Sequence, residues 1–97
     1  SGMDQYSREQ LGARGIRLAS AAGVNARAVA EHAIALILAV YRRLPEARDN
    51  QHTKMWRGML GDLAQREDEI AGKTMLVVGM GRIGSHLAML GKAFGMK

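Results

Sequence analysis

The sequence has no cysteine among its 97 residues. Disulfide bonds and thiolate zinc sites are therefore excluded as sources of its stability. Disulfides are rare in a reducing cytoplasm, so a chain without cysteine fits that compartment. The first residues are polar and lack the basic and apolar stretches of a signal peptide. We therefore expect a cytoplasmic protein.

Aromatic residues are also scarce, at 4% of the chain. The 14 Lys and Arg residues outnumber the 9 Asp and Glu residues, but they are scattered along the sequence. Proteins that bind nucleic acids usually gather their basic residues on one face, and many add aromatic side chains for stacking. We therefore expect no nucleic-acid partner.

Long apolar runs are absent as well. The longest, residues 33–41, is shorter than the roughly 20 residues that cross a bilayer, so no membrane partner is expected. The three histidines lack the spacing of a metal site or a catalytic triad, and His32, beside Glu31, is expected to be structural. What remains is the composition of an ordinary small globular domain, 47% hydrophobic and 24% charged.

The first part of the chain predicts a short helix followed by a short strand. Residues 4–11 form the expected helix, with Asp4 or Ser7 as its N-cap, and glycines end it. The alternating residues 16–19 predict the strand.

A long helix is expected to follow Asn25, which is a favourable N-cap. Apolar residues fall on almost every face of residues 33–40, so this helix should lie between other layers, most of which the chain lacks. Pro45 either ends the helix or opens a new one at its first turn. Residues 48–69 are expected to be polar and irregular, with Trp56 as a packing anchor.

The last third of the chain predicts a strand, a glycine turn and a helix in succession. Residues 74–78 form an apolar run typical of a buried parallel strand. The turn Gly-Met-Gly-Arg-Ile-Gly occupies residues 79–84, and a helix is expected over residues 85–94. Gly95 suits the position after a helix, and residues 96–97 can start a second strand.

Each glycine of the turn has a physical role in binding a dinucleotide. Gly79 allows a sharp turn, Gly81 lets a pyrophosphate approach the backbone, and Gly84 lets the helix pack closely on the strand. The N–H groups of Arg82, Ile83 and Gly84 would point at the phosphates, aided by the helix dipole. For Arg82 we favour the N–H over the side chain as the contact. The turn is not a Walker A loop, because no Gly-Lys-Ser/Thr follows.

Several stretches in order make the chain resemble the D-isomer-specific 2-hydroxyacid dehydrogenases, which include phosphoglycerate dehydrogenase and glyoxylate/hydroxypyruvate reductase. They are residues 1–4 (SGMD), 15–18 (GIRL), 25–32 (NARAVAEH), 36–42 (LILAVYR), Trp56, 70–74 (IAGKT) and the glycine turn. The resemblance implies an α/β fold, with the chain a fragment of a two-domain Rossmann-type protein. Residues 1–24 would end the substrate domain, and residues 25–97 would begin the dinucleotide-binding domain with a crossover helix. Residues 41–69 would pack against a second subunit in a homodimer.

The resemblance also implies a reaction, hydride transfer between NAD or NADP and a small 2-oxo or 2-hydroxy acid. The backbone near Gly2 would hold the substrate carboxylate, and Val29 would lie beside the nicotinamide. The family's catalytic Arg, Glu and His lie downstream of the glycine turn, so no catalytic residue is expected in this chain, which alone should be inactive. The residue that chooses between NAD and NADP would also lie beyond Lys97. The alternative is a non-enzymatic, NAD-sensing corepressor of the same fold.

Overall fold

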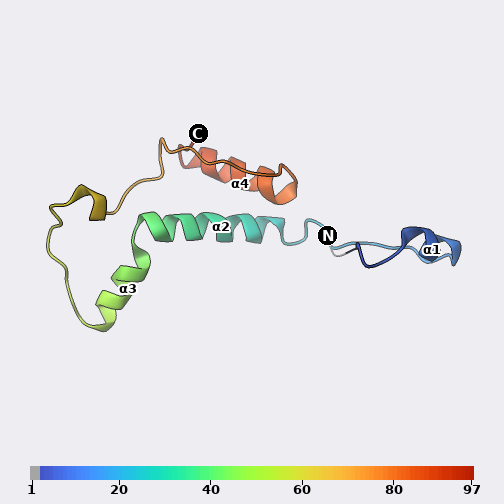
Figure 1. The fold of residues 1–97 in the computed structure, drawn as a ribbon, viewed down its shortest axis with the longest axis horizontal. Coiled ribbons are helices and arrows are strands. Elements are labelled where there is room, and N and C mark those ends of the chain that lie inside the picture. Colours follow the sequence, from blue (N-terminus) through green and yellow to red (C-terminus); the bar gives the residue numbers. More distant parts are fainter. Residues whose placement is uncertain (1–2) are drawn as a thin grey trace.

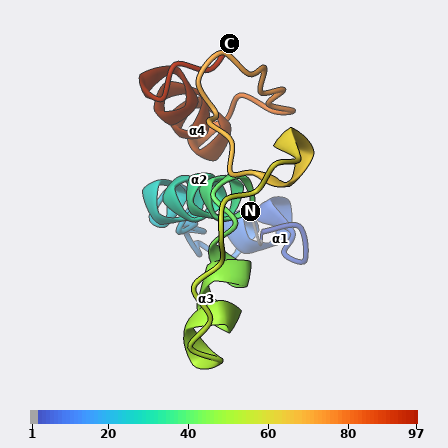
Figure 2. The same ribbon diagram turned by 90° about the vertical axis from the view of Figure 1, so that its left-hand side faces the viewer.

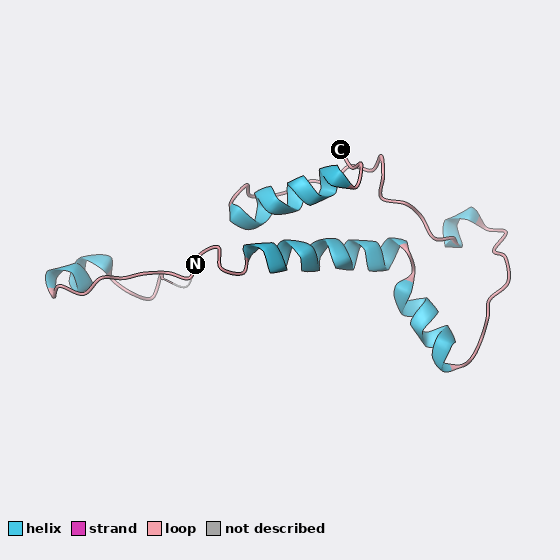
Figure 3. Cartoon of the chain, turned by 180° about the vertical axis from the view of Figure 1, so that it is seen from behind, coloured by secondary structure: helices cyan, strands magenta, loops and turns pink. Residues whose placement is uncertain are grey.

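The computed structural model describes residues 3–97, and its regular structure is helical (Figures 1 and 3). The elements are α1 (Arg8–Ala13), α2 (Ala26–Tyr41), α3 (Leu44–His52), the 3-10 helix η1 (Leu63–Gln65) and α4 (Arg82–Ala93). No helix within residues 3–97 combines the length and apolar character that a membrane span requires.

Helix α1 stands apart from the other helices. It begins after Ser7, whose hydroxyl accepts a hydrogen bond from the Gln10 N–H at 3.2 Å, so Ser7 rather than Asp4 is the N-cap. It ends at Ala13, and Gly15 shortly after it has a φ of +69°. Within residues 3–97, α1 packs against no other helix, and an extended segment separates it from α2 (Figure 1).

Helices α2 and α4 lie side by side and form the core (Figures 1 and 2). Helix α2 buries Ala26, Ala30 and Ile34, which are spaced by four residues and therefore share one face. Ala30 is completely buried, and its small side chain allows a neighbour to approach closely. Asn25 occupies the N-cap position as expected, but its side chain makes no capping bond.

The other faces of α2 are left uncovered. Leu36 is 56% exposed and Val40 is 72% exposed. The layers that should enclose this helix are therefore not supplied by residues 3–97, in line with the expectation that the chain lacks most of them.

Pro45 opens a helix, so the second of its two alternatives is correct. It lies in the first turn of α3, where a missing N–H costs nothing. Arg43, with a φ of 51°, forms the left-handed corner between α2 and α3. The prediction of an irregular segment from residue 48 was wrong as far as His52. The Arg48 Nε donates to His52 Nε2 at 2.9 Å, one turn apart within α3.

The predicted strands at residues 16–19 and 74–78 are absent from residues 3–97, so the strand content of the expected α/β fold is not confirmed. A strand exists only with a partner, and residues 16–19 have none here. Residues 73–75 pair through backbone hydrogen bonds with a single residue, Lys97. The Lys97 N–H donates to the Lys73 carbonyl and the Met75 N–H donates to the Lys97 carbonyl, both at 2.8 Å. Lys97 thus bonds to the residues on both sides of Thr74, which is the hydrogen-bond pattern of parallel strands. Strand pairing therefore begins at residues 96–97, where a second strand was expected.

The chain is extended for its length. Its radius of gyration is 20.7 Å, whereas a compact domain of this size has about 13 Å. Its accessible surface is 8085 Å², about 2,700 Å² more than a folded monomer of 10.5 kDa exposes. Much of this excess is apolar, because Trp56, Met59 and Val78 are each more than 90% exposed.

Candidate dinucleotide-binding site

The glycine turn has the geometry that its three glycines predict. Gly79 has a φ of +97°, a left-handed conformation that a residue with a Cβ rarely adopts. A Cβ at Gly84 would lie 1.9 Å from the Gly79 carbonyl oxygen and 3.3 Å from Val77 Cγ1. Only glycine therefore lets α4 pack so closely against the segment before the turn.

The N-terminus of α4 is open to an anion. Gly81 is the N-cap and has no side chain to occupy the first N–H groups of the helix. A Cβ built on Gly81 would meet no atom within 4 Å, so the backbone there can be approached. The first intrahelical bond runs from the Ser85 N–H to the Gly81 carbonyl at 2.9 Å, which leaves the N–H groups of residues 82–84 without helical partners. Such N–H groups, with the helix dipole, attract phosphate.

A cleft of about 680 Å³ lies between the glycine turn and residues 21–25. It is lined by Ala21, Ala22, Gly23, Asn25, Leu76, Val77, Val78, Gly79, Gly81, Arg82, Ile83, Gly84 and Leu87. The cleft thus brings five predicted cofactor-binding residues together with the loop before α2. No role was predicted for that loop, although its Ala-Ala-Gly run is typical of backbone that a neighbouring group approaches closely.

The Arg82 side chain lines the cleft and reaches the loop before α2. Its guanidinium Nη1 donates a hydrogen bond to the Ala22 carbonyl. The N–H of Arg82 has no helical partner at the start of α4. That this N–H rather than the side chain contacts the phosphate stays a prediction.

One further predicted cofactor contact does not join this cleft. Val29, on α2, is 39% exposed and lies outside the residues that line the cleft. Gly2 lies outside the described residues. Within residues 3–97 no three His, Cys, Asp or Glu side chains come together as a metal site would require.

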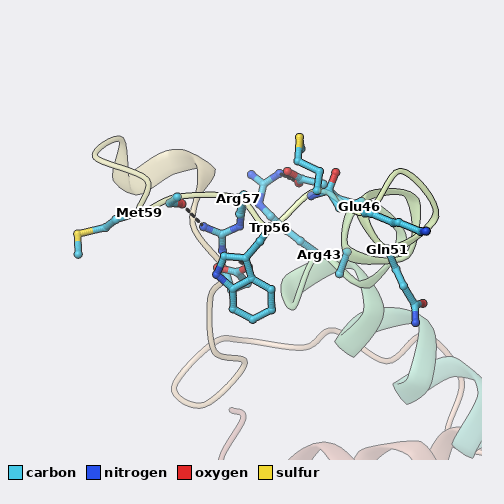
Figure 4. A pocket seen from close by; sticks show the side chains of 12 residues that line it. Arg43, Glu46, Gln51, Trp56, Arg57 and Met59 are labelled. Atoms are coloured by element: carbon cyan, nitrogen blue, oxygen red, sulfur yellow. Dashed lines mark hydrogen bonds and ion pairs between the residues drawn. The ribbon is translucent and has the colours of Figure 1, made fainter.

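A second cavity, of about 700 Å³, lies between α3 and the segment after it (Figure 4). Trp56 at its edge is 97% exposed, so the predicted packing anchor packs on nothing within residues 3–97. Met59 points away from α3 and is 93% exposed (Figure 4). Nearby, the guanidinium of Arg57 pairs with the Glu67 carboxylate and lowers the pKa of Glu67 below its usual 4.5.

A group of polar contacts ties the segment before the glycine turn to the end of α2. The Asp68 N–H donates to the Tyr41 carbonyl at 2.9 Å, and the ammonium of Lys73 lies 2.9 Å from the Asp68 carboxylate and 5.2 Å from the centre of the Tyr41 ring. The hydrogen bond from Lys73 lowers the pKa of Asp68 below 3.8, and the same bond raises the pKa of Lys73 above 10.5. We call these three residues the Tyr41–Asp68–Lys73 clasp.

Known proteins are similar to this sequence over nearly its full length. A glyoxylate reductase from Aeropyrum pernix is 40% identical over an alignment of 99 positions, which covers 99% of this chain and 30% of the relative. A D-3-phosphoglycerate dehydrogenase from Dictyostelium discoideum is 35% identical over 95 residues, which cover 98% of this chain and 22% of the relative. The chain therefore spans less than a third of the length of these relatives.

Solved structures share its fold. A dehydrogenase from Rhizobium meliloti matches with a TM-score of 0.78 and 32% identity, over 100% of this chain and 32% of that one. A phosphoglycerate dehydrogenase from Lactobacillus plantarum matches with a TM-score of 0.62 and 30% identity, over 98% of this chain and 29% of that one. Residues 34–97, about two thirds of the chain, match the NAD binding domain of D-isomer specific 2-hydroxyacid dehydrogenases. The chain therefore belongs to the D-isomer-specific 2-hydroxyacid dehydrogenase family.

Proposed function

We propose that the chain is part of an NAD(P)-dependent enzyme that transfers hydride between nicotinamide and a small 2-oxo or 2-hydroxy acid. The observation that carries the proposal is the turn at residues 79–84. There α4 packs closely on the preceding segment at Gly84, and no side chain caps the helix N-terminus. This N-terminus borders a cleft large enough for a pyrophosphate.

The residues of this chain bind and orient the cofactor. The N–H groups of Arg82, Ile83 and Gly84 hold the pyrophosphate, and the absence of a Cβ at Gly81 lets it reach the backbone. The bound nicotinamide supplies or accepts the hydride. Val29 is proposed to face the nicotinamide ring and the backbone at Gly2 to hold the substrate carboxylate. The catalytic Arg, Glu and His are supplied by the rest of the parent protein, so these 97 residues alone should not turn over a 2-oxo or 2-hydroxy acid.

The parent protein is proposed to be a cytoplasmic homodimer with two domains. Residues 1–24 end the substrate domain and residues 25–97 begin the dinucleotide-binding domain. The isolation of α1 from the other helices supports a boundary at that point. The exposed Trp56 and Met59 support residues 41–69 as the part that packs against a second subunit.

The experiment is to measure NADH and NADPH consumption by the full product of the gene, offered glyoxylate, hydroxypyruvate or pyruvate. Turnover with one of these acids is expected, and the preferred cofactor follows from the same assay. Tight dinucleotide binding without turnover on a wider panel of 2-oxo acids would favour an NAD-sensing corepressor. No binding at all would refute the assignment of the glycine turn.

A matched pair of variants tests the turn itself. Gly84→Ala places a methyl group 1.9 Å from a backbone oxygen, and we expect dinucleotide affinity to fall by about a hundredfold. Gly61→Ala is the control, because a Cβ there meets no atom within 4 Å. Equal affinities for the two variants would place the pyrophosphate elsewhere.

A further inference from the structure

Residues 42–67 leave the paired helices and return to almost the same place, and we call them the α3 arm. The arm begins directly after Tyr41, the last residue of α2, and ends directly before Asp68. The Asp68 N–H donates to the Tyr41 carbonyl at 2.9 Å, so the two ends of the arm meet. Between these ends, α3 projects away from α2 and α4 (Figures 1 and 2).

Arginine side chains hold the two ends of the arm together. The Arg42 Nη1 donates to the Asp68 carbonyl at 3.2 Å, on the residue whose N–H already bonds to Tyr41. The Arg43 Nη2 donates to the Ala64 carbonyl at 3.3 Å. Arg43 is also the left-handed corner before α3, so the residue that turns the chain outward binds the chain again on its way back.

Lys73 connects this base to the segment that leads into the glycine turn. Its ammonium lies 2.9 Å from the Asp68 carboxylate and 5.2 Å from the centre of the Tyr41 ring. Its carbonyl accepts a hydrogen bond from the Lys97 N–H at 2.8 Å, in the pairing described above. The side chain and the backbone of Lys73 therefore join the base of the arm to the part of the chain that carries the cofactor site.

The outer part of the arm differs from its base in being exposed. Trp56 and Met59 are almost fully accessible to solvent and lie on the segment after α3. A surface that must be ordered when it binds a partner loses affinity, because the free energy of ordering is subtracted from that of binding. A base that fixes the arm before the partner arrives removes part of this cost.

We propose that the Tyr41–Asp68–Lys73 clasp positions the α3 arm for a second copy of this chain and strengthens the dimer without touching the partner. This inference rests on the proposed function, in which residues 41–69 pack against a second subunit. Lys73 and Asp68 are then positioning residues, whereas Trp56 contacts the partner. Loss of the clasp should weaken association and leave the dinucleotide site intact.

The test is a double-mutant cycle in the full product of the gene, with Lys73→Met, Trp56→Ala and both together. Lys73→Met keeps an unbranched side chain but removes the ion pair with Asp68, and Asp68→Asn breaks the same pair from the other side. Sedimentation equilibrium gives the dissociation constant of the dimer. Hydrogen–deuterium exchange of the peptide that contains the Asp68 amide reports whether the base of the arm is closed.

Lys92→Met is the control for the loss of a positive charge. Lys92 is exposed on α4, and its ammonium makes no ion pair within residues 3–97. The NADH dissociation constant is measured for every variant at a protein concentration where the dimer is fully formed. This measurement separates an effect on association from an effect on the cofactor site.

We expect Lys73→Met or Asp68→Asn to raise the dimer dissociation constant by about fivefold and to speed exchange at the Asp68 amide. When Trp56 is already Ala, removing the clasp should change dimer affinity by less than about twofold, because an arm without its contacting side chain gains little from being positioned. The NADH dissociation constant should stay within about twofold of its original value. Lys92→Met should change none of these quantities.

Two results would overturn the proposal. Additive losses of dimer affinity in the double variant would mean that Lys73 contacts the partner directly. Unchanged exchange at Asp68 in both clasp variants would mean that the clasp does not hold the base of the arm. Neither measurement uses a dinucleotide, so a dimer that binds no NADH would refute the proposed reaction and not this inference.

Discussion

Two regions of this chain differ in whether their apolar side chains are buried or exposed. Helices α2 and α4 bury Ala26, Ala30 and Ile34 between themselves and neighbouring segments. The segment after α3 presents Trp56 and Met59 almost fully to solvent. Within residues 3–97, one face of α2 has packing partners, whereas Trp56 and Met59 have none. The difference separates a surface that is already packed from one that is exposed within residues 3–97.

The largest expected effect concerns the chain in isolation. An excess of about 2,700 Å² of accessible surface is more than a standard protein interface buries. We expect the 97 residues alone to associate or to unfold without a cooperative transition. Sedimentation velocity and urea denaturation followed by circular dichroism would measure this. A monomer with a sharp transition would show that the exposed regions need no partner.

Trp56 should account for much of the proposed contact between two copies of the parent protein. Buried tryptophans at interface centres commonly contribute 2 kcal/mol or more, so Trp56→Ala should weaken the dimer by about thirtyfold or more. Sedimentation equilibrium measures the dissociation constant. Tyr6→Ala removes another exposed aromatic outside this segment and serves as the control. An unchanged dimer in Trp56→Ala would remove this segment from the interface.

The packing of α2 on α4 should be sensitive to volume at Ala30. Ala30 is completely buried, so Ala30→Leu should lower the free energy of unfolding of the parent protein by about 1–3 kcal/mol. Ala28→Leu, on an exposed face of the same helix, controls for helix propensity. Urea midpoints compare the two. Similar values would mean that the face buried here is not the one that packs in the parent.

The Tyr41–Asp68–Lys73 clasp should produce a small dependence of stability on pH. The pKa of Asp68 is lowered in the folded state, chiefly by its bond to Lys73, so the stabilisation is present above pH 3.8 and is lost as pH falls further. The group is exposed, so the effect is modest.

Urea midpoints of the parent protein between about pH 5 and about pH 3 would measure this dependence. Asp68→Asn should flatten the acid side of the profile. Asp49→Asn should not, because the Asp49 side chain makes no hydrogen bond or ion pair within residues 3–97. Identical profiles for the two variants would show that the clasp contributes nothing.

Local signals predicted local structure well. Ser7 caps α1, Pro45 opens α3, and Gly95 with its φ of +78° follows the end of α4. Each feature depends on the steric limits or hydrogen bonds of a few adjacent residues, and the identity of those residues can be read from the sequence. The strand at residues 74–78 was predicted from the same kind of pattern but is absent, because a strand needs a paired neighbour and residues 76–78 have none within residues 3–97. Backbone hydrogen bonds with residues 95–97 reach only residues 72–75.

The sequence by itself determined the glycine turn, its place before α4 and the family to which the chain belongs. A positive φ at Gly79 and the need for a missing Cβ at Gly84 follow from backbone sterics that any chain with this spacing obeys. The tertiary structure alone decided that the Arg82 guanidinium reaches Ala22 and that one face of α2 is buried while Leu36 is not. These outcomes depend on which distant segments meet, and apolar residues on every face of a helix carry no information about which face finds a partner.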